Sequence, residues 1–266
     1  MSELHPNFKK VYCPLRRVEY KINRDDWKKH GSRLMLREPK VYLATPEINP
    51  DVYVSWVWDE DAYAVEKLHG TNLCIEMKEG CLETMQNRLN PMNFTKLVGN
   101  KQGIAKAGRF LEGVIHAAER NYLHRDGVEY GELIGPSMNQ NIHKTDRHLW
   151  YPFKRAQKQL RYNSFGKFPK EYWGWSEWFR LHLKSILYCR LNGVHLRDAF
   201  SDDNVPFTEG IVIYKDREEG EKPLMAKLRR DMFFWYYCED IEIFGLGEEF
   251  ISHAKEKGIK VKGYTD

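Results

Sequence analysis

The sequence has little of what marks a secreted or membrane-bound protein. Its 5 cysteines are odd in number and widely spread, and no Cys-x-x-Cys pair occurs among them. This pattern argues against a disulfide framework or a zinc knuckle and favours a reducing compartment. No apolar stretch approaches the roughly 18 residues of a membrane span, and residues 1–14 are too polar for a signal peptide. We therefore expect a cytoplasmic protein that does not enter a membrane.

An excess of charge of one sign is also missing. Lysine and arginine number 42 against 38 aspartates and glutamates, which gives a formal net charge of +4. Such mild basicity permits a polyanionic partner but does not require one. Hydrophobic residues make up 42% of the chain and aromatic residues 14%, which is ample for a packed core.

Hydrophobic patterning predicts one α+β body with antiparallel strands, because hairpin signals outnumber alternating strand–helix units. Strands are predicted at 40–44, 52–57, 62–67, 73–78, 81–86, 128–134, 149–153, 211–214 and 224–228. Helices are predicted at 102–123, 175–187, 231–237 and 248–257. The first helix would bury Ile104, Ala107, Leu111, Val114, Ile115 and Ala118. The second would face the core, with Ser176 as its cap.

The segment around Lys67 has the form expected of a covalent nucleophile. Residues 65–72 read Val-Glu-Lys-Leu-His-Gly-Thr-Asn, so the lysine leaves an apolar stretch shortly before a glycine turn. Backbone amides and short side chains in this turn are free to meet a phosphate. An attacking lysine must be neutral, although free lysine titrates near ~10.4, and burial or nearby cations lower that value.

Two basic residues late in the chain have the spacing needed to activate such a lysine. Lys227 and Arg229 flank Leu228 in a predicted strand, so their side chains point to the same face. Facing a pocket, they would grip a phosphate and repel the proton of Lys67. Taken alone, the pair fits a solvated basic edge better.

Two glutamates lie inside apolar strands. Glu132 lies between Gly131 and Leu133, and Glu209 precedes Gly210 and an apolar run. Buried carboxylates are costly unless paired, so two of them in hydrophobic strands indicate a site. The carboxylate of Glu209 can hold a divalent ion or a ribose hydroxyl. Each glutamate alone equally fits a structural salt bridge.

Taken in order, these residues resemble the nucleotidyltransferase motifs of ATP-dependent ligases and capping enzymes. The matching positions are Lys67, Arg88, 130–135 (YGELIG), 209–213 (EGIVI) and 226–229 (AKLR). Motifs in order and correctly spaced form a strong joint signal, whereas each alone is weak. The His-Gly-Thr-Asn form is similar to the RNA ligase 2 family, because DNA ligases and capping enzymes usually carry Asp where this chain has His69.

The resemblance implies a fold and a set of site residues. The fold is an ATP-grasp-like nucleotidyltransferase domain with antiparallel sheets over 59–240, completed by segment 1–58. A short helical tail over 241–266 follows, without a C-terminal OB-fold. Lys67, Glu209 and Lys227 are implied to be catalytic, with Glu209 also binding Mg²⁺ or Mn²⁺. The residues implied to bind the nucleotide of ATP are Glu66, His69, Asn72, Arg88, Glu132, Phe153 and Arg229.

We therefore expect an ATP-dependent RNA ligase that joins 5′-phosphate and 3′-hydroxyl ends of RNA or of a nicked duplex. The reaction would pass through lysyl-AMP and an adenylylated 5′ end. Basic residues outside the motifs, among them Lys154, Arg155 and Lys158, would contact strand phosphates. A GTP-dependent mRNA-capping guanylyltransferase and a non-catalytic RNA-binding domain of the same fold stay open as alternatives. The stretch after Arg229 is too short for the OB-fold of capping enzymes.

A second cluster of metal-ligating residue types occurs at His143, Asp146 and His148. No further ligands are clustered with them, and structural zinc sites usually need four. We therefore expect a surface loop at these positions.

Overall fold

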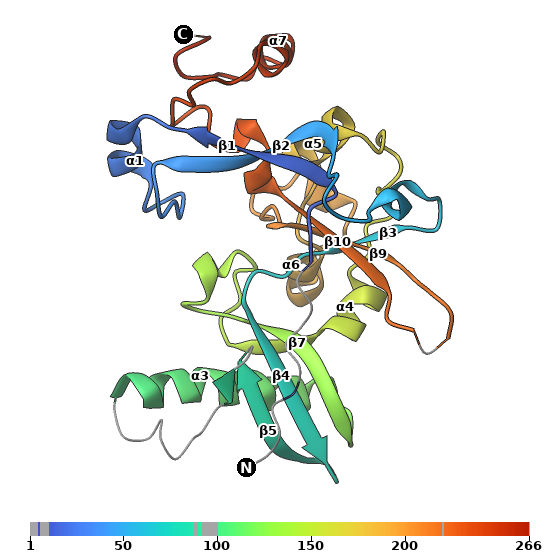
Figure 1. The fold of residues 1–266 in the computed structure, drawn as a ribbon. Coiled ribbons are helices and arrows are strands. Elements are labelled where there is room, and N and C mark those ends of the chain that lie inside the picture. Colours follow the sequence, from blue (N-terminus) through green and yellow to red (C-terminus); the bar gives the residue numbers. More distant parts are fainter. Residues whose placement is uncertain (1–4, 6–10, 88–89, 92–100, 220, 266) are drawn as a thin grey trace. The chain divides into compact units, whose positions relative to one another are not determined.

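The computed structural model describes residues 5, 11–87, 90, 91, 101–219 and 221–265, with the backbone alone at 90, 91 and 101–103. Within it the chain divides into two compact units. Unit 1 comprises 1–11, 63–163 and 182–212, and unit 2 comprises 12–62, 164–181 and 213–266. Each unit thus combines segments that are far apart in the sequence, as the colours of Figure 1 show.

Unit 1 is built on a five-stranded antiparallel sheet of order β6-β5-β4-β7-β8. Its strands are β4 (Thr71–Lys78), β5 (Cys81–Asn87), β6 (Asn90–Pro91), β7 (Gly127–Ile134) and β8 (Leu149–Pro152). Glu79 and Gly80, with φ of 52° and 80°, join β4 to β5 in the predicted two-residue turn. Asn72 of β4 pairs with Glu132 of β7, so two residues predicted to bind nucleotide share one level of the sheet.

Helix α3 (Lys101–Glu119) lies along this sheet (Figure 1) and confirms the predicted helix. The predicted buried face is only half right. The buried residues are Ala107, Phe110, Val114 and Ala117. The predicted core residues that are instead exposed are Ile104, Leu111, Ile115 and Ala118. The reason is Gly113: a Cβ there would lie 2.1 Å from Leu133 Cδ1, so the helix turns its glycine toward β7 and approaches closely.

The predicted helix at 175–187 is two helices, α5 (Tyr172–Leu181) in unit 2 and α6 (Ile186–Asn192) in unit 1. Between them the backbone of residues 183 and 184 pairs with 207 and 208, where Thr208 N–H donates to Leu183 O. Ser185 then caps α6 by accepting from Tyr188 N–H. Ser176, the predicted cap, lies buried inside α5.

The remaining elements of unit 1 are short. They are β3 (Tyr63–Glu66), η2 (Asn139–Asn141), α4 (Phe153–Gln159), η3 (Asp198–Phe200) and the start of β9 (Gly210–Lys215). The boundary between the two units falls within β9, after Val212.

Unit 2 contains an antiparallel pair of strands and a core rich in aromatic residues. Strand β1 (Leu15–Lys21) pairs with β2 (Lys40–Ile48), and α1 (Arg24–His30) between them begins at Asn23, whose side chain accepts from Asp25 and Asp26 N–H. The other elements are η1 (Ser55–Trp58), β10 (Leu224–Arg229), η4 (Arg230–Met232), η5 (Phe234–Tyr236) and α7 (Glu248–Glu256). The core rings include Tyr172, Trp175, Phe179, Phe233 and Phe250.

Two local predictions for unit 2 are wrong. The strand predicted at 52–57 is replaced by η1, because Val57 N–H donates to Val54 O and Trp56 Nε1–H to Tyr53 O. These local bonds hold the segment in a 3₁₀ helix instead of an extended strand. The helix predicted at 231–237 is replaced by the two 3₁₀ turns η4 and η5, in which buried Phe233 is the extended residue between the turns.

Strands β1 and β2 pair antiparallel, as do the neighbouring strands of the five-stranded sheet, which agrees with the antiparallel pairing predicted for an α+β chain. The division into 1–58, 59–240 and 241–266 and the nucleotidyltransferase class stay predictions. Among the described residues, no helix combines the length and apolar character that crossing a membrane requires.

The close approach of α3 to β7 gives a testable prediction. Gly113→Ala should lower the free energy of unfolding by about 1–3 kcal/mol, because the added methyl must displace the fully buried Leu133 side chain. Gly108→Ala is the control on the same helix. A Cβ at Gly108 meets nothing within 4 Å, and alanine there should stabilise the protein by about 0.5–1 kcal/mol. If the urea unfolding curves of the two variants coincide, the close packing of Gly113 against Leu133 is contradicted.

Candidate active site

The backbone of Lys67 is fixed at the end of β3 by contacts within unit 1. Lys67 N–H donates to Gly210 O over 2.9 Å, and its carbonyl accepts from Thr208 Oγ1 over 3.2 Å. Lys67 therefore leaves the strand in a defined direction, with the start of β9 beside it.

Gly70 allows the turn after Lys67 to lie directly on β7. A Cβ at this position would lie 2.0 Å from Leu133 O, so only glycine fits. Gly70 N–H donates to Glu132 Oε1 over 3.1 Å. Burial raises the pKa of Glu132 to about 7, although the charge of Lys67 acts to lower it. Glu132 thus stands beside the lysine motif, as its sequence position suggested.

One oxygen of Glu209 joins two side chains of the motif that are predicted to belong to the site. Glu209 Oε2 accepts from Lys67 Nζ and from His69 Nδ1, each over 2.6 Å. Burial alone would raise the pKa of Glu209, but the charge of Lys67 and the hydrogen bond from His69 outweigh it and lower the pKa to about 2. Glu209 is therefore ionised at neutral pH and orients both side chains.

His69 has one ring nitrogen left for a ligand. Its Nδ1 donates to the ionised carboxylate, so Nδ1 carries a proton. Its Nε2 is buried and has no hydrogen-bond partner among the described residues. A buried polar atom without a partner is costly, and it marks a position that a bound molecule can satisfy.

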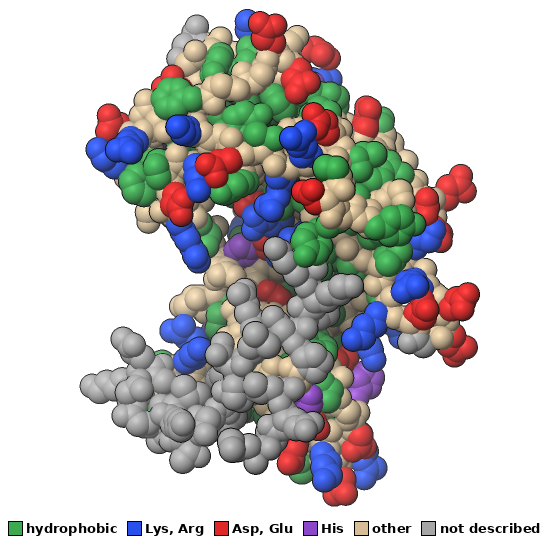
Figure 2. Space-filling view, in the orientation of Figure 1, with side chains coloured by type: hydrophobic (Ala, Val, Ile, Leu, Met, Phe, Trp, Pro, Cys, Tyr) green, Lys and Arg blue, Asp and Glu red, His purple; other side chains and the backbone are tan. Residues whose placement is uncertain are grey.

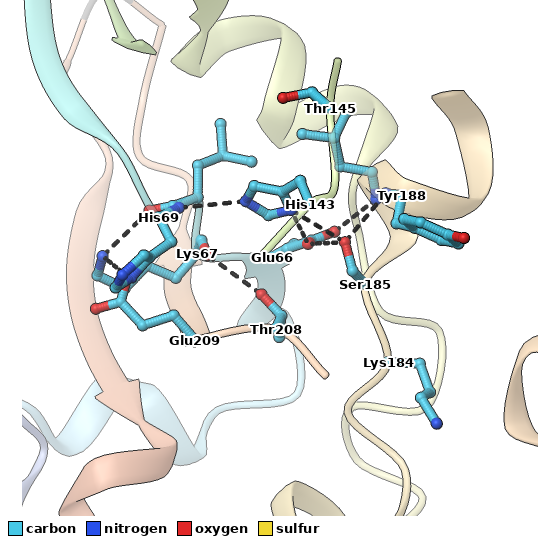
Figure 3. A network of polar contacts seen from close by, with 12 residues as sticks. Glu66, Lys67, His69, His143, Thr145, Lys184, Ser185, Tyr188, Thr208 and Glu209 are labelled. Atoms are coloured by element: carbon cyan, nitrogen blue, oxygen red, sulfur yellow. Dashed lines mark hydrogen bonds and ion pairs between the residues drawn. The ribbon is translucent and has the colours of Figure 1, made fainter. Parts of the chain in front are cut away.

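Behind the motif lies a second, fully buried set of polar groups, shown in Figure 3. His69 N–H donates to His143 Nε2 over 3.3 Å, while His143 Nδ1 lies 3.2 Å from Ser185 Oγ and 3.5 Å from Glu66 Oε1. Glu66 in turn accepts from Ser185 Oγ over 2.6 Å and from Leu187 N–H over 2.7 Å. A chain of hydrogen bonds thus connects the lysine turn to the N-terminus of α6.

The proton positions in this network follow from its hydrogen bonds. A backbone N–H can only donate, so His143 Nε2 accepts and the proton of the neutral ring is on Nδ1. Burial lowers the pKa of His143 to about 3, which keeps the ring neutral. Burial also raises the pKa of Glu66 to about 7, against the hydrogen bonds from Ser185 and Leu187. His143 is therefore neutral, and Glu66 holds a proton below about pH 7, beside the charged Lys67–Glu209 pair.

The loop between β7 and β8 holds the lysine turn from outside the sheet. Asn139 Nδ2 donates to Gly70 O, and His143 receives the bond from His69 N–H. Non-glycine residues with left-handed backbone in this loop are Ser137, Asn139, Gln140, Asn141 and Lys144. Such conformations cost of order 1 kcal/mol each, least for Asn, and persist where the surroundings enforce them.

The surface-loop prediction for His143 and His148 is wrong. Their exposed fractions are 0% and 7%, and only Asp146 of the three is exposed. His148 is held between Glu112 Oε2 and Pro136 O. The available signal was the run Ser137-Met138-Asn139-Gln140-Asn141, because asparagine tolerates a left-handed backbone and a run of such residues favours a tightly wound loop over an open one.

The other predicted site residues are spread over both units. Phe153 begins α4 in unit 1 and is half-buried, whereas Arg88 lies outside the described residues. Lys227 and Arg229 lie on β10 in unit 2 and alternate with buried Leu228, as predicted. Lys227 N–H donates to Tyr12 O, and Arg229 pairs with Asp231 over 3.0 Å. The structure thus brings together Lys67, His69 and Glu209, with Glu132 beside them, and leaves the phosphate role of β10 a prediction.

The predicted strand-binding residues of α4 differ in their surroundings. Lys154 and Lys158 are exposed, whereas the Arg155 guanidinium lies 3.9 Å from the centre of the Tyr122 ring. Arg155 thus has an intramolecular partner, while the two lysines face solvent.

A magnesium ion would have to be held here mainly by a bound nucleotide. No three His, Cys, Asp or Glu side chains among the described residues are close enough to hold a metal ion by themselves. Mg²⁺ commonly binds through one or two carboxylates, with phosphate oxygens and water completing its shell. The ionised carboxylate of Glu209 beside Lys67 fits that pattern.

Comparisons with known proteins add little to this geometry. No family model and no curated protein matches the sequence. Among solved structures, an apo mutant of RNA ligase R4a from Naegleria gruberi is similar, with 13% identity and a TM-score of 0.31. The match covers 85% of this chain and 58% of that ligase. A TM-score this low does not establish a shared fold, so the similarity carries no weight for function.

The buried network gives a prediction about pH. Glu66→Gln keeps an acceptor for Leu187 N–H but cannot ionise. In the folded protein Glu66 holds a proton up to about pH 7, whereas its reference pKa is 4.5. Wild-type stability should therefore fall relative to Glu66→Gln as the pH rises from about 5 to 7, by up to about 3 kcal/mol.

Urea unfolding at both pH values measures the difference. Glu83→Gln, an exposed position on β5, is the control and should show none. A Glu66→Gln curve that stays parallel to wild type across this range would show that Glu66 is already ionised in the folded state.

Proposed function

We propose that this protein is an ATP-dependent RNA ligase that works through a covalent lysyl-AMP on Lys67. The observation that carries the proposal is the shared Glu209 oxygen, which holds Lys67 Nζ and His69 Nδ1 at 2.6 Å each. Lys67 and His69, two positions apart, thus both donate to one ionised carboxylate beside the Gly70 turn. This arrangement supports a common site for the first and fourth of the motifs found in the sequence.

The first step is attack of Lys67 Nζ on the α-phosphorus of ATP. Lys67 first loses the proton that makes it a cation; its neutral amine then forms the N–P bond, the P–O bond to pyrophosphate breaks, and the nitrogen loses a second proton. Glu209 Oε2 lies 2.6 Å from Nζ, within hydrogen-bond distance of these protons. Because its carboxylate is ionised and also held by His69, it orients the amine before the nucleotide arrives.

The later steps follow from the same intermediate. A 5′-phosphate oxygen of RNA attacks the lysyl-AMP phosphorus, which breaks the N–P bond and adenylylates the 5′ end. A 3′-hydroxyl then attacks the 5′ phosphorus, forms the phosphodiester and releases AMP. Through these steps Lys67 returns to its free amine.

Side chains around Lys67 supply nucleotide contacts in this proposal. The Nε2 atom of His69, buried without a partner among the described residues, accepts a hydrogen bond from a ribose hydroxyl, because the ring proton is on Nδ1. Glu132 and Asn72, paired across β4 and β7, face the ribose, and Phe153 stacks on the purine. Lys227 and Arg229 on β10 neutralise the α-phosphate. Arg88 keeps the nucleotide-contact role that its place in the motifs implies, whereas Glu66, whose two carboxylate oxygens already accept from Ser185 and Leu187, acts through the buried network behind the turn.

Magnesium or manganese enters with ATP. Glu209 would be its protein ligand, with phosphate oxygens and water as the others, and the ion would offset the charge on the transferring phosphate.

Incubation with labelled nucleotide tests this proposal. Wild-type protein with α-labelled ATP and Mg²⁺ should acquire one covalent label, whereas Lys67→Ala and Lys67→Arg should acquire none, because alanine has no amine and a guanidinium stays protonated. Lys78→Ala, an exposed lysine of β4 in the same unit, should label normally.

Other outcomes distinguish the alternatives. A label from GTP but not from ATP would make the protein a capping guanylyltransferase. Absence of any label on wild type would leave an RNA-binding domain, and a label that survives on Lys67→Ala would place the nucleophile elsewhere.

A further inference from the structure

A cavity in unit 1 is lined by positively charged side chains, and none of its lining residues is among the predicted nucleotide contacts. Its volume is about 400 Å³. Three separate segments meet there: the end of α3, the loop after His143 and the end of α6. Residues that line it include His116, Arg120, Lys144, Asp146, Arg147 and Asn192.

The cations of this cavity have few acidic partners. Arg120 Nε donates to His116 Nε2 over 3.0 Å, and no described carboxylate pairs with it. Lys144 Nζ donates to Asn204 O and lies 5.6 Å from the centre of the Tyr188 ring. Only Arg147 faces an acid, Glu119 at 3.8 Å, and both of those side chains are half-exposed. Three positive charges thus surround a space whose lining contains one carboxylate, that of Asp146.

Holding these cations together costs the protein free energy. Like charges around one cavity repel each other, and Lys144 adopts a left-handed backbone with φ of 49°. A cation after the C-terminus of α3 is common, because it offsets the helix dipole, and this accounts for Arg120 alone. It does not account for Lys144 and Arg147, which come from another segment. An anionic ligand would account for all three.

The mixed charge of the surface gives a local cluster of cations more significance. On the face drawn in Figure 2, as far as the structure describes it, Lys and Arg side chains are interspersed with Asp and Glu. Over the whole chain the two signs nearly cancel, with 42 lysines and arginines against 38 aspartates and glutamates. A polyanion must then be held by local clusters, since no broad field would gather it on that face.

We propose that this cavity binds the ribose-phosphate backbone of an RNA strand, an inference that rests on the proposed ligase function for the identity of its ligand. Arg120, Lys144 and Arg147 contact the phosphodiester oxygens, each of which belongs to a group with a single negative charge. Asp146 accepts a hydrogen bond from a ribose 2′-hydroxyl, and Asn192 adds a further polar contact. The Asp146 carboxylate repels the denser charge of a triphosphate, which separates this cavity from the nucleotide site.

The cavity is joined to the lysine turn through one residue. Lys144 directly follows His143, whose ring accepts from His69 N–H. The loop that positions the nucleophile therefore also supplies part of the strand-binding surface, so a strand held there would bear on the segment that fixes His69.

Fluorescence anisotropy with a labelled, 5′-phosphorylated single-stranded RNA tests the proposal on the whole chain. Arg120→Gln/Arg147→Gln should bind about tenfold or more weaker than wild type, because two charge-assisted contacts are lost. The slope of log affinity against log salt should fall by about 1.4. The matched control Lys78→Gln/Arg125→Gln removes the same charge from exposed positions of unit 1 and should change neither quantity comparably.

Competition identifies the ligand. Unlabelled RNA should displace the labelled strand better than DNA of the same sequence, and inorganic phosphate at equal ionic strength should not displace it. Equal displacement by DNA would overturn the assignment of a ribose contact, and displacement by phosphate would make the cavity a small-anion site. Unchanged affinity and slope in Arg120→Gln/Arg147→Gln, or no RNA binding by wild type, would overturn the proposal.

Labelling of Lys67 from ATP is measured on the same preparations, with thermal unfolding as a check on folding. Absence of the label on the wild-type protein would contradict the ligase function. The RNA affinity of Arg120→Gln/Arg147→Gln separately decides whether the cavity binds RNA. The two failures are therefore distinguishable.

Discussion

The hydrogen bonds of Lys67 and His69 to a single oxygen of Glu209 are the interaction on which the rest of the candidate site depends. The pair is only partly exposed, with side chains at 22% for Lys67 and 14% for Glu209, so its charges are less screened than those of a surface pair. A partly buried carboxylate can stay ionised here only because a cation faces it. Removal of either partner would leave an uncompensated charge, and the geometry of the turn would lose its anchor.

The three glutamates of this region show how environment separates identical side chains. Burial raises the pKa of Glu66 and of Glu132 to about 7, whereas Lys67 and His69 lower that of Glu209 to about 2. One carboxylate thus carries charge at neutral pH while the others can carry protons, a division of roles that is common where chemistry is done. The neutral ring of His143 links the buried network to the backbone of His69 without placing another charge beside the Lys67–Glu209 pair.

Much of the fold could be predicted from the sequence, and the failures have physical causes. Period-two segments and the Glu79-Gly80 turn placed β4, β5 and β7, because strand alternation is a local property. The face of α3 was misjudged because Gly113 and Phe110, rather than larger aliphatic residues at other positions, face the sheet. Lys67, Glu132 and Glu209, which the structure brings close together, were selected by the order and spacing of the motifs, since each residue alone fits a structural role equally well. His143 was missed, because its role comes from a loop conformation and from partners at Glu66 and Ser185 that are distant in sequence.

The site chemistry is tested most directly by mapping the covalent adduct. Wild-type protein incubated with ATP and Mg²⁺ is digested, and its peptides are analysed by mass spectrometry under conditions that preserve an acid-labile N–P bond. The account predicts one adenylate on the peptide that contains Lys67, with loss of the adduct on mild acid treatment as expected of a phosphoramidate. An adenylate on any other residue, or an acid-stable adduct on this peptide, would contradict it.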